Sequence, residues 1–472
     1  MTPLRIVLFC HSLVSDWNHG NAHFLRGVAW ELRARGHHVA IYEPEDSWSR
    51  ANLVEQLREA GYAPEDAFAW FRVAYPGLES SMYPPDGPDL GPILEDADLL
   101  IVHEWTDAAL VGRIGNAVAA LPAAHRPVLL FHDTHHRAVT APAEMAAYDM
   151  RHYDGVLAFG NVLRDLYLAR GWAARAWTWH EAADTRIFRP LADEPQADKG
   201  LTQDLVWVGN WGDDERAAEL EEFLLDPVRR LGLRAQVYGV RYPGQALAAL
   251  ERAGVTYGGW LPNYRVPHVF ATAALTVHIP RRPYTRALPG IPTIRIFEAL
   301  ACGIPLICAP WDDAEGLFKP GADYLVARDG AEMDRQLHAI LRDPDLAAAL
   351  RSHGLRTILA RHTCAYRVDE LLTIVAELRG SDPLTLAIPA HTSTVTVEAH
   401  GNAPTVIADA PTVNTPTVAV GTHRSASPRG DTPTVAAVLP EGVPATTVVA
   451  HGCAPNGTPR DVGTATIAPG GA

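Results

Sequence analysis

The sequence has 472 residues, of which 47% are hydrophobic, and its formal net charge is −15. That length suits two or three domains, and the acidic balance argues against a nucleic-acid surface, which requires a basic footprint. The five cysteines show no metal or redox spacing, no signal peptide is recognisable, and no apolar run approaches the roughly 20 residues of a membrane helix. We therefore expect a cytoplasmic protein with reduced thiols, no membrane span and no nucleic-acid partner.

The first part of the chain alternates β-rich runs with helical stretches, which is the signature of parallel-sheet α/β units. A helix is predicted over 23–36, where Gly36 provides a natural C-cap, and a later helix is expected to end near Gly171. The predicted strands of this part are 5–12, 38–44, 96–105, 126–136 and 153–160.

A second α/β series follows a linker that we predict at 186–204. The two α/β domains are therefore expected at 1–185 and 205–380, with a cleft between them. In open parallel sheets, ligands bind beyond the carboxyl ends of the strands, and polar residues of this sequence cluster there. The predicted strands of the second series are 204–210, 233–239, 275–280, 304–310 and 323–327.

Residues 381–472 differ sharply in composition from the rest. They contain 12 of the 37 prolines and no Phe, Trp, Tyr, Met or Lys, so they cannot bury enough apolar side chain to offset the entropy of ordering. We predict a disordered tail rich in Pro, Thr, Val and Ala, because its prolines oppose the sheet that its Thr-Val pairs would favour. A role as a tether or as a region of threonine modification is the functional alternative.

The loop "VSDWNHGNAHF" (14–24) joins the first predicted strand to the first predicted helix. Gly20 permits close backbone approach, and the helix that follows Asn21 offers unpaired N–H groups to an anion. The loop lacks the G-x-G-x-x-G pattern, so a dinucleotide pocket of that type is not expected. We interpret Gly20 and Asn21 as ligand-binding residues, and a plain loop with an Asn cap is the alternative.

The segment "FHDTHHR" (131–137) places three His and one Asp at the end of a predicted strand. We take His132 as the first residue after the strand and as a catalytic proton carrier or hydroxyl ligand, with Asp133 and His135 to orient it or to contact substrate. A zinc site is one alternative, but no second cluster with metal spacing stands out and the H-E-x-x-H order is absent. A polar turn with satisfied imidazoles is the other alternative.

The segment "IPTIRIFEALACGIPLICAP" (291–310) carries Arg295 and Glu298 in otherwise apolar surroundings. An unpaired charge is costly inside a protein, so each needs a partner. The two lie three residues apart in a helix predicted over roughly 294–302 with Thr293 as its cap, so an internal ion pair is one interpretation. We favour a ligand, because a carboxylate accepts hydrogen bonds from vicinal hydroxyls such as those of ribose, and a guanidinium binds phosphate oxygens.

More arginines follow two other predicted strands. Arg282 lies in the Pro-rich loop 278–290, and Arg216 follows the Gly-containing loop that starts at 209. Either could hold a diphosphate. Ordinary surface arginines are the alternative.

With these residues in view, the chain resembles a known family. The stretch "IRIFEALACGIPLI" is similar to the E-A-x-A-x-G-x-P segment of nucleotide-sugar glycosyltransferases of the GT-B fold, group 1. Residues 1–380 as a whole resemble the CgeB-like, or spore-maturation-protein-like, branch. The stretches "HEAADTRIFRP" (180–190) and "LVWVGNWGDDER" (205–216) support that likeness, in the same order along the chain.

The resemblance implies two Rossmann-like domains, of which the first binds an acceptor and the second a nucleotide-diphosphate sugar, with a final helix that crosses back to the first. Catalysis would be metal-independent. By position, Glu298 matches a glutamate that holds ribose, and Arg216 the region of the phosphate-binding basic residues. His132 matches a histidine near the reacting sugar, and Gly20 a flexible, phosphate-facing first loop.

The sequence departs from the family at one position. The pattern E-x7-E places a first glutamate eight residues before Glu298, where this chain has Gly290. In the family that glutamate contacts the transferred sugar, although CgeB-like sequences commonly lack it. The departure puts the identity of the sugar, and activity itself, in question.

These features predict a metal-independent glycosyltransferase that moves a sugar to an unknown acceptor, which is a glycan, a protein or a small molecule. The resemblance favours retention of configuration, and no cofactor is expected beside the donor substrate. A non-catalytic protein that binds nucleotide sugars or glycans is one alternative, and a sugar-nucleotide epimerase is another.

Overall fold

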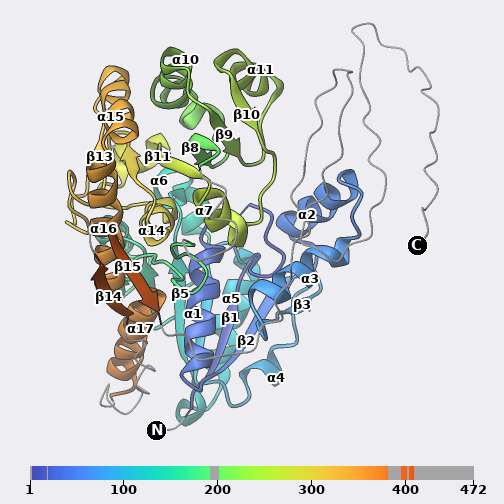
Figure 1. The fold of residues 1–472 in the computed structure, drawn as a ribbon. Coiled ribbons are helices and arrows are strands. Elements are labelled where there is room, and N and C mark those ends of the chain that lie inside the picture. Colours follow the sequence, from blue (N-terminus) through green and yellow to red (C-terminus); the bar gives the residue numbers. More distant parts are fainter. Residues whose placement is uncertain (1–2, 19, 192–200, 381–394, 401–402, 409–472) are drawn as a thin grey trace, which may run out of the picture. The chain divides into compact units, whose positions relative to one another are not determined.

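The computed structural model of the chain describes residues 3–18, 20–191, 201–380, 395–400 and 403–408. Residues 1–408 form one compact unit, which contains two parallel sheets and their helices (Figure 1). The central part of the predicted linker and most of the predicted disordered tail lie outside the described residues. Within that tail the structure has one antiparallel strand pair that the sequence did not predict, β14 (Val395–His400) with β15 (Ala403–Ala408).

The first sheet has seven strands in the order β3-β2-β1-β4-β5-β6-β7, and every pairing is parallel. Each βαβ connection passes through a helix, as parallel strands require. The central strands β1, β4 and β5 are almost entirely buried, which explains their continuous apolar sequence. The strands are β1 (Arg5–Phe9), β2 (His38–Pro44), β3 (Ser81–Tyr83), β4 (Leu99–His103), β5 (Val128–Asp133), β6 (Gly155–Ala158) and β7 (Ala176–Thr178).

The second sheet has six strands in the order β10-β9-β8-β11-β12-β13, again all parallel. The predicted α/β class with two parallel-sheet halves is therefore confirmed. All ten predicted strands are present, and the short strands β3, β7 and β10 were not predicted. The strands are β8 (Gln203–Val208), β9 (Ala235–Tyr238), β10 (Val255–Tyr257), β11 (Ala273–His278), β12 (Leu306–Cys308) and β13 (Leu325–Val326).

The helices of the first half are α1 (Ala22–Ala34), α2 (Trp48–Glu59), α3 (Pro64–Ala74), α4 (Leu90–Leu94), α5 (Ala108–Ala120), α6 (Arg137–Thr140), α7 (Pro142–Ala146) and α8 (Asn161–Ala169). Those of the second half are α9 (Ala217–Leu220), α10 (Asp226–Leu231), α11 (Gly244–Ala253), α12 (Val266–Phe270), α13 (Arg282–Ala287), α14 (Ile294–Ala301), α15 (Gly330–Arg342), α16 (Pro344–Arg361) and α17 (Cys364–Arg379). A π-helical turn, Glu221–Leu225, joins α9 to α10.

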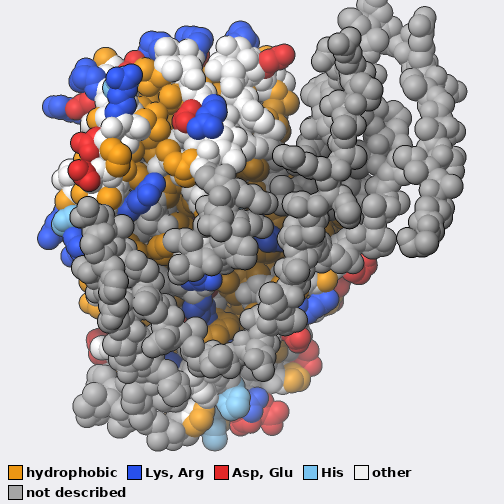
Figure 2. Space-filling view, viewed as in Figure 1, with side chains coloured by type: hydrophobic (Ala, Val, Ile, Leu, Met, Phe, Trp, Pro, Cys, Tyr) orange, Lys and Arg blue, Asp and Glu red, His pale blue; other side chains and the backbone are white. Residues whose placement is uncertain are grey.

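Two outer helices of the second sheet end where the sequence provides a left-handed glycine. Gly232 follows α10 with φ +63°, and Gly254 follows α11 with φ +72°. Their last turns carry arginine, which interacts favourably with the negative end of the helix dipole. Figure 2 shows blue Lys and Arg side chains gathered over this outer end of the second half.

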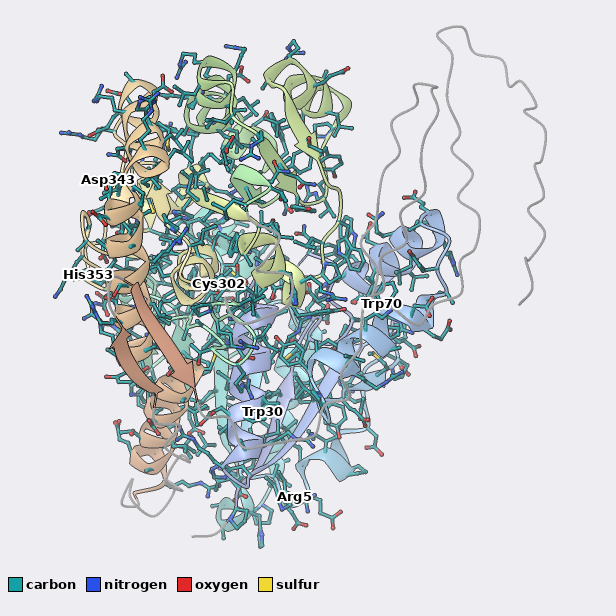
Figure 3. The ribbon with its side chains drawn as sticks, in the orientation of Figure 1. Arg5, Trp30, Trp70, Cys302, Asp343 and His353 are labelled. Atoms are coloured by element: carbon teal, nitrogen blue, oxygen red, sulfur yellow. The ribbon has the colours of Figure 1, made fainter. Side chains whose placement is uncertain are left out.

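The final helix, α17, packs against α1 of the first half. Their close approach depends on Gly27, where an added Cβ would lie 2.3 Å from Cys364 Sγ and 2.9 Å from Asp184 Cβ. On the same helix α1, the ring of Trp30 (Figure 3) stacks 3.6 Å from the Arg186 guanidinium. The main apolar core is continuous across both halves, since Phe24 belongs to the same buried cluster as residues of α14 and α17.

Replacing Gly27 with alanine tests this packing. Gly27→Ala is expected to lower the free energy of unfolding by about 1–3 kcal/mol, because the new methyl group overpacks the contact with Cys364. Chemical denaturation measures the change. Gly112→Ala on α5 is the matched control, since its Cβ would meet only Asp149 at an ordinary 3.5 Å. That control should be neutral or stabilising by about 0.5–1 kcal/mol. Equal effects of the two substitutions would contradict the packing argument.

Candidate functional site

The carboxyl ends of β8 and β11 form the switch point of the second sheet, because the chain turns to β9 on one side and to β12 on the other. Ligands of open α/β sheets bind at such points. Three guanidinium groups and one imidazole influence one another there, and we call them the arginine cluster: Arg216, His278, Arg281 and Arg295.

Arg216, at the start of α9, is the centre of this cluster. Its guanidinium donates to the carbonyls of Ile279 at 3.0 Å and Asn210 at 2.5 Å, and its Nε has no hydrogen-bond partner among the described residues. No carboxylate of the described chain lies within ion-pair distance of it. Burial, and then repulsion from Arg281 and Arg295, lowers the pKa of Arg216 from 12.5 to about 9. A partly buried cation that pairs directly with no carboxylate of the described residues is well suited to receive an anion.

Gly212 allows Arg216 to fold back over its own loop. The glycine has φ +82°, and a Cβ on it would lie 2.7 Å from Arg216 Nε. The neighbouring imidazole of His278 bonds Thr293 Oγ1 at 2.9 Å. Burial and the charges of Arg216 and Arg295 lower the pKa of His278 to about 3, so its ring is neutral at pH 7.

Other arginines near the switch point have carboxylate partners. Arg281 donates to Glu215 at 2.9 Å, and the predicted ligand-binding residue Arg282 donates to Glu219 at 2.8 Å. Glu215 also lies 3.8 Å from His136 Nε2 of the first half. The structure therefore brings Arg216 and Arg295 into one cluster, while Arg282 is held beside it by Glu219.

Glu298 lies on α14, which spans Ile294–Ala301 close to the predicted range, and it is fully buried. It accepts hydrogen bonds from Arg295, from Asn263 at 2.7 Å and from His23 Nδ1 of α1 at 3.0 Å. The internal ion pair with Arg295 is thus present. Arg295 is the nearest cation and lowers the pKa of Glu298, with His23 adding to the effect against the opposing cost of burial. Contact with ribose stays a prediction, and a ribose would have to share this carboxylate with protein donors.

His23 uses both ring nitrogens, and the contact of its Nδ1 with Glu298 connects the two halves. Its Nε2 accepts from the backbone N–H of Asp184 at 2.7 Å, so the proton is on Nδ1 and is donated to Glu298. A second contact of this kind is made by Glu315, which accepts from the backbone N–H of Asn161 at 2.7 Å and bonds His180 at 2.9 Å. We call the group formed by the carboxylates of Glu298 and Glu315 and their partners His23, Asn161 and His180 the junction.

Glu181 is a buried acid that the sequence analysis did not single out. Its carboxyl group lies close to the backbone N–H of Ile294 at the start of α14, while Thr293 occupies the N-cap position without capping through its hydroxyl. Burial, and then repulsion from Glu298, raises the pKa of Glu181 well above its usual value. The sequence gives no signal for this residue, because its importance arises from a helix more than 100 positions away.

Gly20 and Asn21 lie where the first loop approaches other elements. A Cβ at Gly20 would lie 3.1 Å from Ile294, so this loop reaches the start of α14. Asn21 does not cap α1 through its side chain. Its amide contacts His103 Nε2 at 3.1 Å and donates to Thr134 Oγ1, which joins the first loop to the ends of β4 and β5. Ligand binding by Gly20 and Asn21 stays a prediction.

The structure places His132 and Asp133 inside β5, not after it, and the expected orientation of His132 by Asp133 is wrong. Successive strand residues point to opposite faces. His132 therefore packs against Trp179, with ring centroids 4.9 Å apart, and its ring nitrogens have no hydrogen-bond partner among the described residues. Asp133 instead accepts from Tyr167 at 2.7 Å on the other face. The catalytic roles of both residues stay predictions, and any such role must operate from fully buried side chains.

Polar residues beyond β4 and β5 are better placed to face the second half. His135 lies 4.0 Å from the ring of His136, which in turn lies 5.3 Å from the ring of Tyr284 on α13. Beneath them, Glu104 is fully buried and is held by Arg137 at 2.9 Å. Burial and the nearby charge of Asp133 raise the pKa of Glu104 well above its usual value. Burial also raises the pKa of Asp133 itself, to about 6.

Gly290 explains the departure from the family pattern in physical terms. Its φ is +85°, which favours glycine, and a Cβ there would lie 2.7 Å from Glu315 Cγ. Gly160 of the first half is equally constrained, because its Cβ would lie 2.3 Å from Ile291. A side chain at position 290 would therefore collide with the junction.

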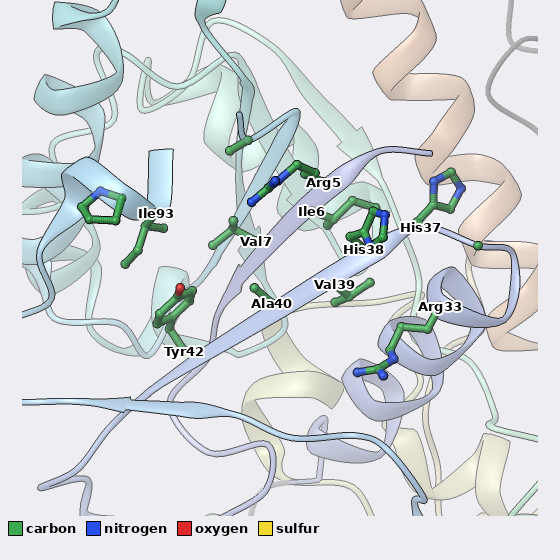
Figure 4. A pocket seen from close by; sticks show the side chains of 13 residues that line it. Arg5, Ile6, Val7, Arg33, His37, His38, Val39, Ala40, Tyr42 and Ile93 are labelled. Atoms are coloured by element: carbon green, nitrogen blue, oxygen red, sulfur yellow. The ribbon is translucent and has the colours of Figure 1, made fainter. Parts of the chain in front are cut away.

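Two cavities lie away from the junction. One, of about 600 Å³, opens at the amino-terminal ends of β1 and β2 and is lined by Arg5, Val7, His38, Tyr42 and Ile93, among others (Figure 4). Because those strand ends are opposite the carboxyl ends, this cavity does not belong to the candidate site. The other, of about 410 Å³, lies beyond the carboxyl ends of β11 and β12.

Two absences concern the described part of the chain. Its helices include none that is both long and apolar enough to cross a lipid bilayer. Nor do its His, Cys, Asp and Glu side chains form any group of three or more arranged to hold a metal ion.

Comparison with known proteins agrees with this architecture. Residues 216–373, about a third of the chain, match the family described as "Glycosyl transferase-like". No curated protein matches the sequence. Sucrose-phosphate synthase from Thermosynechococcus elongatus is 17% identical, with a TM-score of 0.53 over 80% of this chain and 99% of its own.

Two further solved structures show the same likeness. HepE from Anabaena, in complex with UDP and glucose, is 14% identical with a TM-score of 0.54, covering 79% of this chain and 99% of its own. An α-glucosyltransferase, in complex with UDP-glucose and DNA, is 11% identical with a TM-score of 0.57, covering 79% and 100%. At these identities the likeness establishes the fold, which is GT-B-like: two parallel-sheet α/β halves whose carboxyl ends meet.

The burial of His132 predicts an acid-sensitive fold. Burial lowers the pKa of His132 to about 3, whereas an unfolded histidine titrates near 6.5. The unfolded chain therefore binds the extra proton first, and stability falls as the pH drops from about 6.5 towards 3. Over that window His132→Leu should reduce the slope of the free energy of unfolding against pH by about 1.4 kcal/mol per pH unit. Urea denaturation at pH 7, 6 and 5 measures it. His125→Gln at an exposed position is the control, and parallel curves for wild type and His132→Leu would contradict the effect.

A double-mutant cycle tests the His23–Glu298 contact. His23→Ala should lower the free energy of unfolding by about 3 kcal/mol, because it leaves a buried carboxylate short of one donor. In a Glu298→Gln background the same substitution should cost at least about 1 kcal/mol less, since the contact is already weakened. His38→Ala, on an exposed side chain, is the control. Additive effects in the cycle would show that the two side chains do not interact.

Proposed function

We propose that this protein is a glycosyltransferase that binds a nucleotide-diphosphate sugar at the carboxyl ends of the second sheet. The observation that carries the proposal is Arg216: a guanidinium without a carboxylate partner among the described residues, at a sheet switch point, with its pKa lowered by desolvation and then by two neighbouring arginines. An anion with two adjacent phosphate groups would pair with Arg216 and would share Arg281 and Arg295 with their carboxylate partners, Glu215 and Glu298. The glycosyl-transferase-like match over 216–373 covers the same three residues.

The chemistry follows from what these residues can stabilise. The bond between the anomeric carbon and the diphosphate oxygen breaks, and the electron pair leaves with the diphosphate. A nucleophilic oxygen or nitrogen of the acceptor forms the new bond to that carbon and passes its proton to the departing diphosphate. Guanidinium groups stabilise the negative charge that develops on the leaving diphosphate, so the transfer needs neither a metal ion nor a cofactor. Solved structures of similar fold include complexes with UDP and UDP-glucose, which is the same class of donor.

The finer assignments belong to this proposal as well. The acceptor, a glycan, a protein or a small molecule, binds on the first half, where His135 and His136 face α13. Retention of configuration and membership of the CgeB-like branch are supported by the order of motifs along residues 1–380. The cytoplasmic location rests on the composition described above.

Gly290 favours one other candidate, a non-catalytic protein that binds nucleotide sugars. The positive φ and the proximity of Glu315 exclude a glutamate at this position, so a contact that the family makes to the transferred sugar is missing. Incubation with a panel of nucleotide-diphosphate sugars, followed by mass spectrometry of released nucleotide, separates the two candidates. Binding without any release of nucleotide would favour the non-catalytic protein.

Substitution of Arg216 tests the proposed site directly. Arg216→Gln should weaken binding of nucleoside diphosphates by about ten- to a hundredfold, because it removes a charge-assisted contact to phosphate. Isothermal titration calorimetry with UDP and GDP measures the change. Arg230→Gln, on α10 and paired with the partly exposed Asp334, is the matched control. Unchanged affinity in Arg216→Gln, or no binding by the wild type, would contradict the proposed site.

A further inference from the structure

The cavity of about 410 Å³ beyond β11 and β12 adjoins the arginine cluster. Ile279, whose carbonyl accepts from Arg216, lines its wall, and Glu219, which holds Arg282, lines another side. A ligand with its phosphates on the cluster can therefore extend one end into this cavity. The lining consists of Glu219, Phe223, Ile279, Pro280, Thr285, Ala309, Pro310, Trp311 and Asp312.

The walls of this cavity are mainly apolar and include flat side chains. Phe223 comes from the π-helical turn after α9, and Trp311 comes from the loop after β12. Two prolines, Pro280 and Pro310, complete the apolar part. A planar ring with apolar faces suits such walls. A monosaccharide carries hydroxyl groups around its whole perimeter and would leave most of them unpaired here.

The polar side-chain atoms of the cavity include two carboxylates and one donor, the indole Nε1–H of Trp311, which has no hydrogen-bond partner among the described residues. One carboxylate oxygen of Glu219, Oε2, is buried without a partner among the described residues, and Asp312 adds a second carboxylate. Pro280 and Pro310 have no N–H to donate. The backbone N–H of Ala309 is already bonded to the carbonyl of His278. The cavity therefore favours a ligand edge that has two adjacent donors beside a single acceptor.

We infer that this cavity is the subsite for the base of the donor nucleotide and that it selects guanine. This inference rests on the proposed function. Guanine has two adjacent donors on one edge, N1–H and the N2 amino group, which match the carboxylates of Glu219 and Asp312, and its single carbonyl oxygen O6 beside them matches the N–H of Trp311. Uracil presents one N–H between two carbonyl oxygens, and those oxygens would face the same carboxylates. The donor is thus a guanosine-diphosphate sugar, unlike the UDP compounds bound in the similar structures.

Calorimetry with GDP and UDP, without sugar or acceptor, tests the inference on the full-length protein. GDP should bind at least about tenfold more tightly than UDP. Glu219→Gln should weaken GDP binding by about ten- to a hundredfold and leave UDP binding nearly unchanged, because guanine offers this carboxylate two adjacent donors, whereas the single N–H of uracil is flanked by carbonyl oxygens. Asp312→Asn, at an exposed position that cannot disturb folding, should lower the GDP preference in the same direction.

Controls separate the possible outcomes. Glu221→Gln removes the same charge from a neighbouring, half-exposed position outside the cavity and should bind both nucleotides like the wild type. Equal losses for GDP and UDP in Glu219→Gln would show that Glu219 acts by holding Arg282 and not by binding the base, and would overturn the inference. Tighter binding of UDP than of GDP by the wild type would also overturn the inference. Binding of neither nucleotide would instead contradict the proposed function.

Discussion

The arrangement of the two halves depends on one buried carboxylate, Glu298. A carboxylate removed from water is costly unless charge and hydrogen bonds compensate it, and here the compensation comes from both sides. Arg295 and Asn263 belong to its own half, and His23 belongs to the other. His23 can donate only because the backbone N–H of Asp184 occupies its second nitrogen. The hydrogen bond between α1 and α14 therefore depends on one tautomer of His23.

The same contact limits how a nucleotide can bind. If ribose is to reach Glu298, it must compete with His23, which a movement of one half relative to the other would allow. Glu181 adds a second constraint, because its buried carboxyl group already lies beside the first N–H of α14. An anion at that helix start would have to displace it. The arginine cluster has no such internal competitor at Arg216, which is why phosphate recognition is best assigned to the ends of β8 and β11.

The sequence could predict features that depend on neighbouring residues, and it could not predict contacts between residues far apart along the chain. The buried strands are apolar runs with local signals, and the helix at 294–302 has a local periodicity, so both could be predicted. Strands β3 and β10 are short edge strands with exposed residues, and they carry no such pattern. The partners of Glu298 could not be predicted, because His23 is 275 positions away. His132 was misplaced for a smaller reason: the strand continues through its polar end, so it faces the core with Leu130.

The junction also shows that Gly290 has a structural role and is not simply a lost functional residue. Gly160 has a similar role in the first half. Glu315 fills the space beside Gly290, and Ile291 fills the space beside Gly160. Glu315 does bring a carboxylate to the place where the family pattern would put one, but its two oxygens are bonded to Asn161 and His180. That carboxylate therefore holds the halves together. A sugar bound here must be recognised mainly by other groups, so selectivity for the donor shifts towards its phosphates and its base.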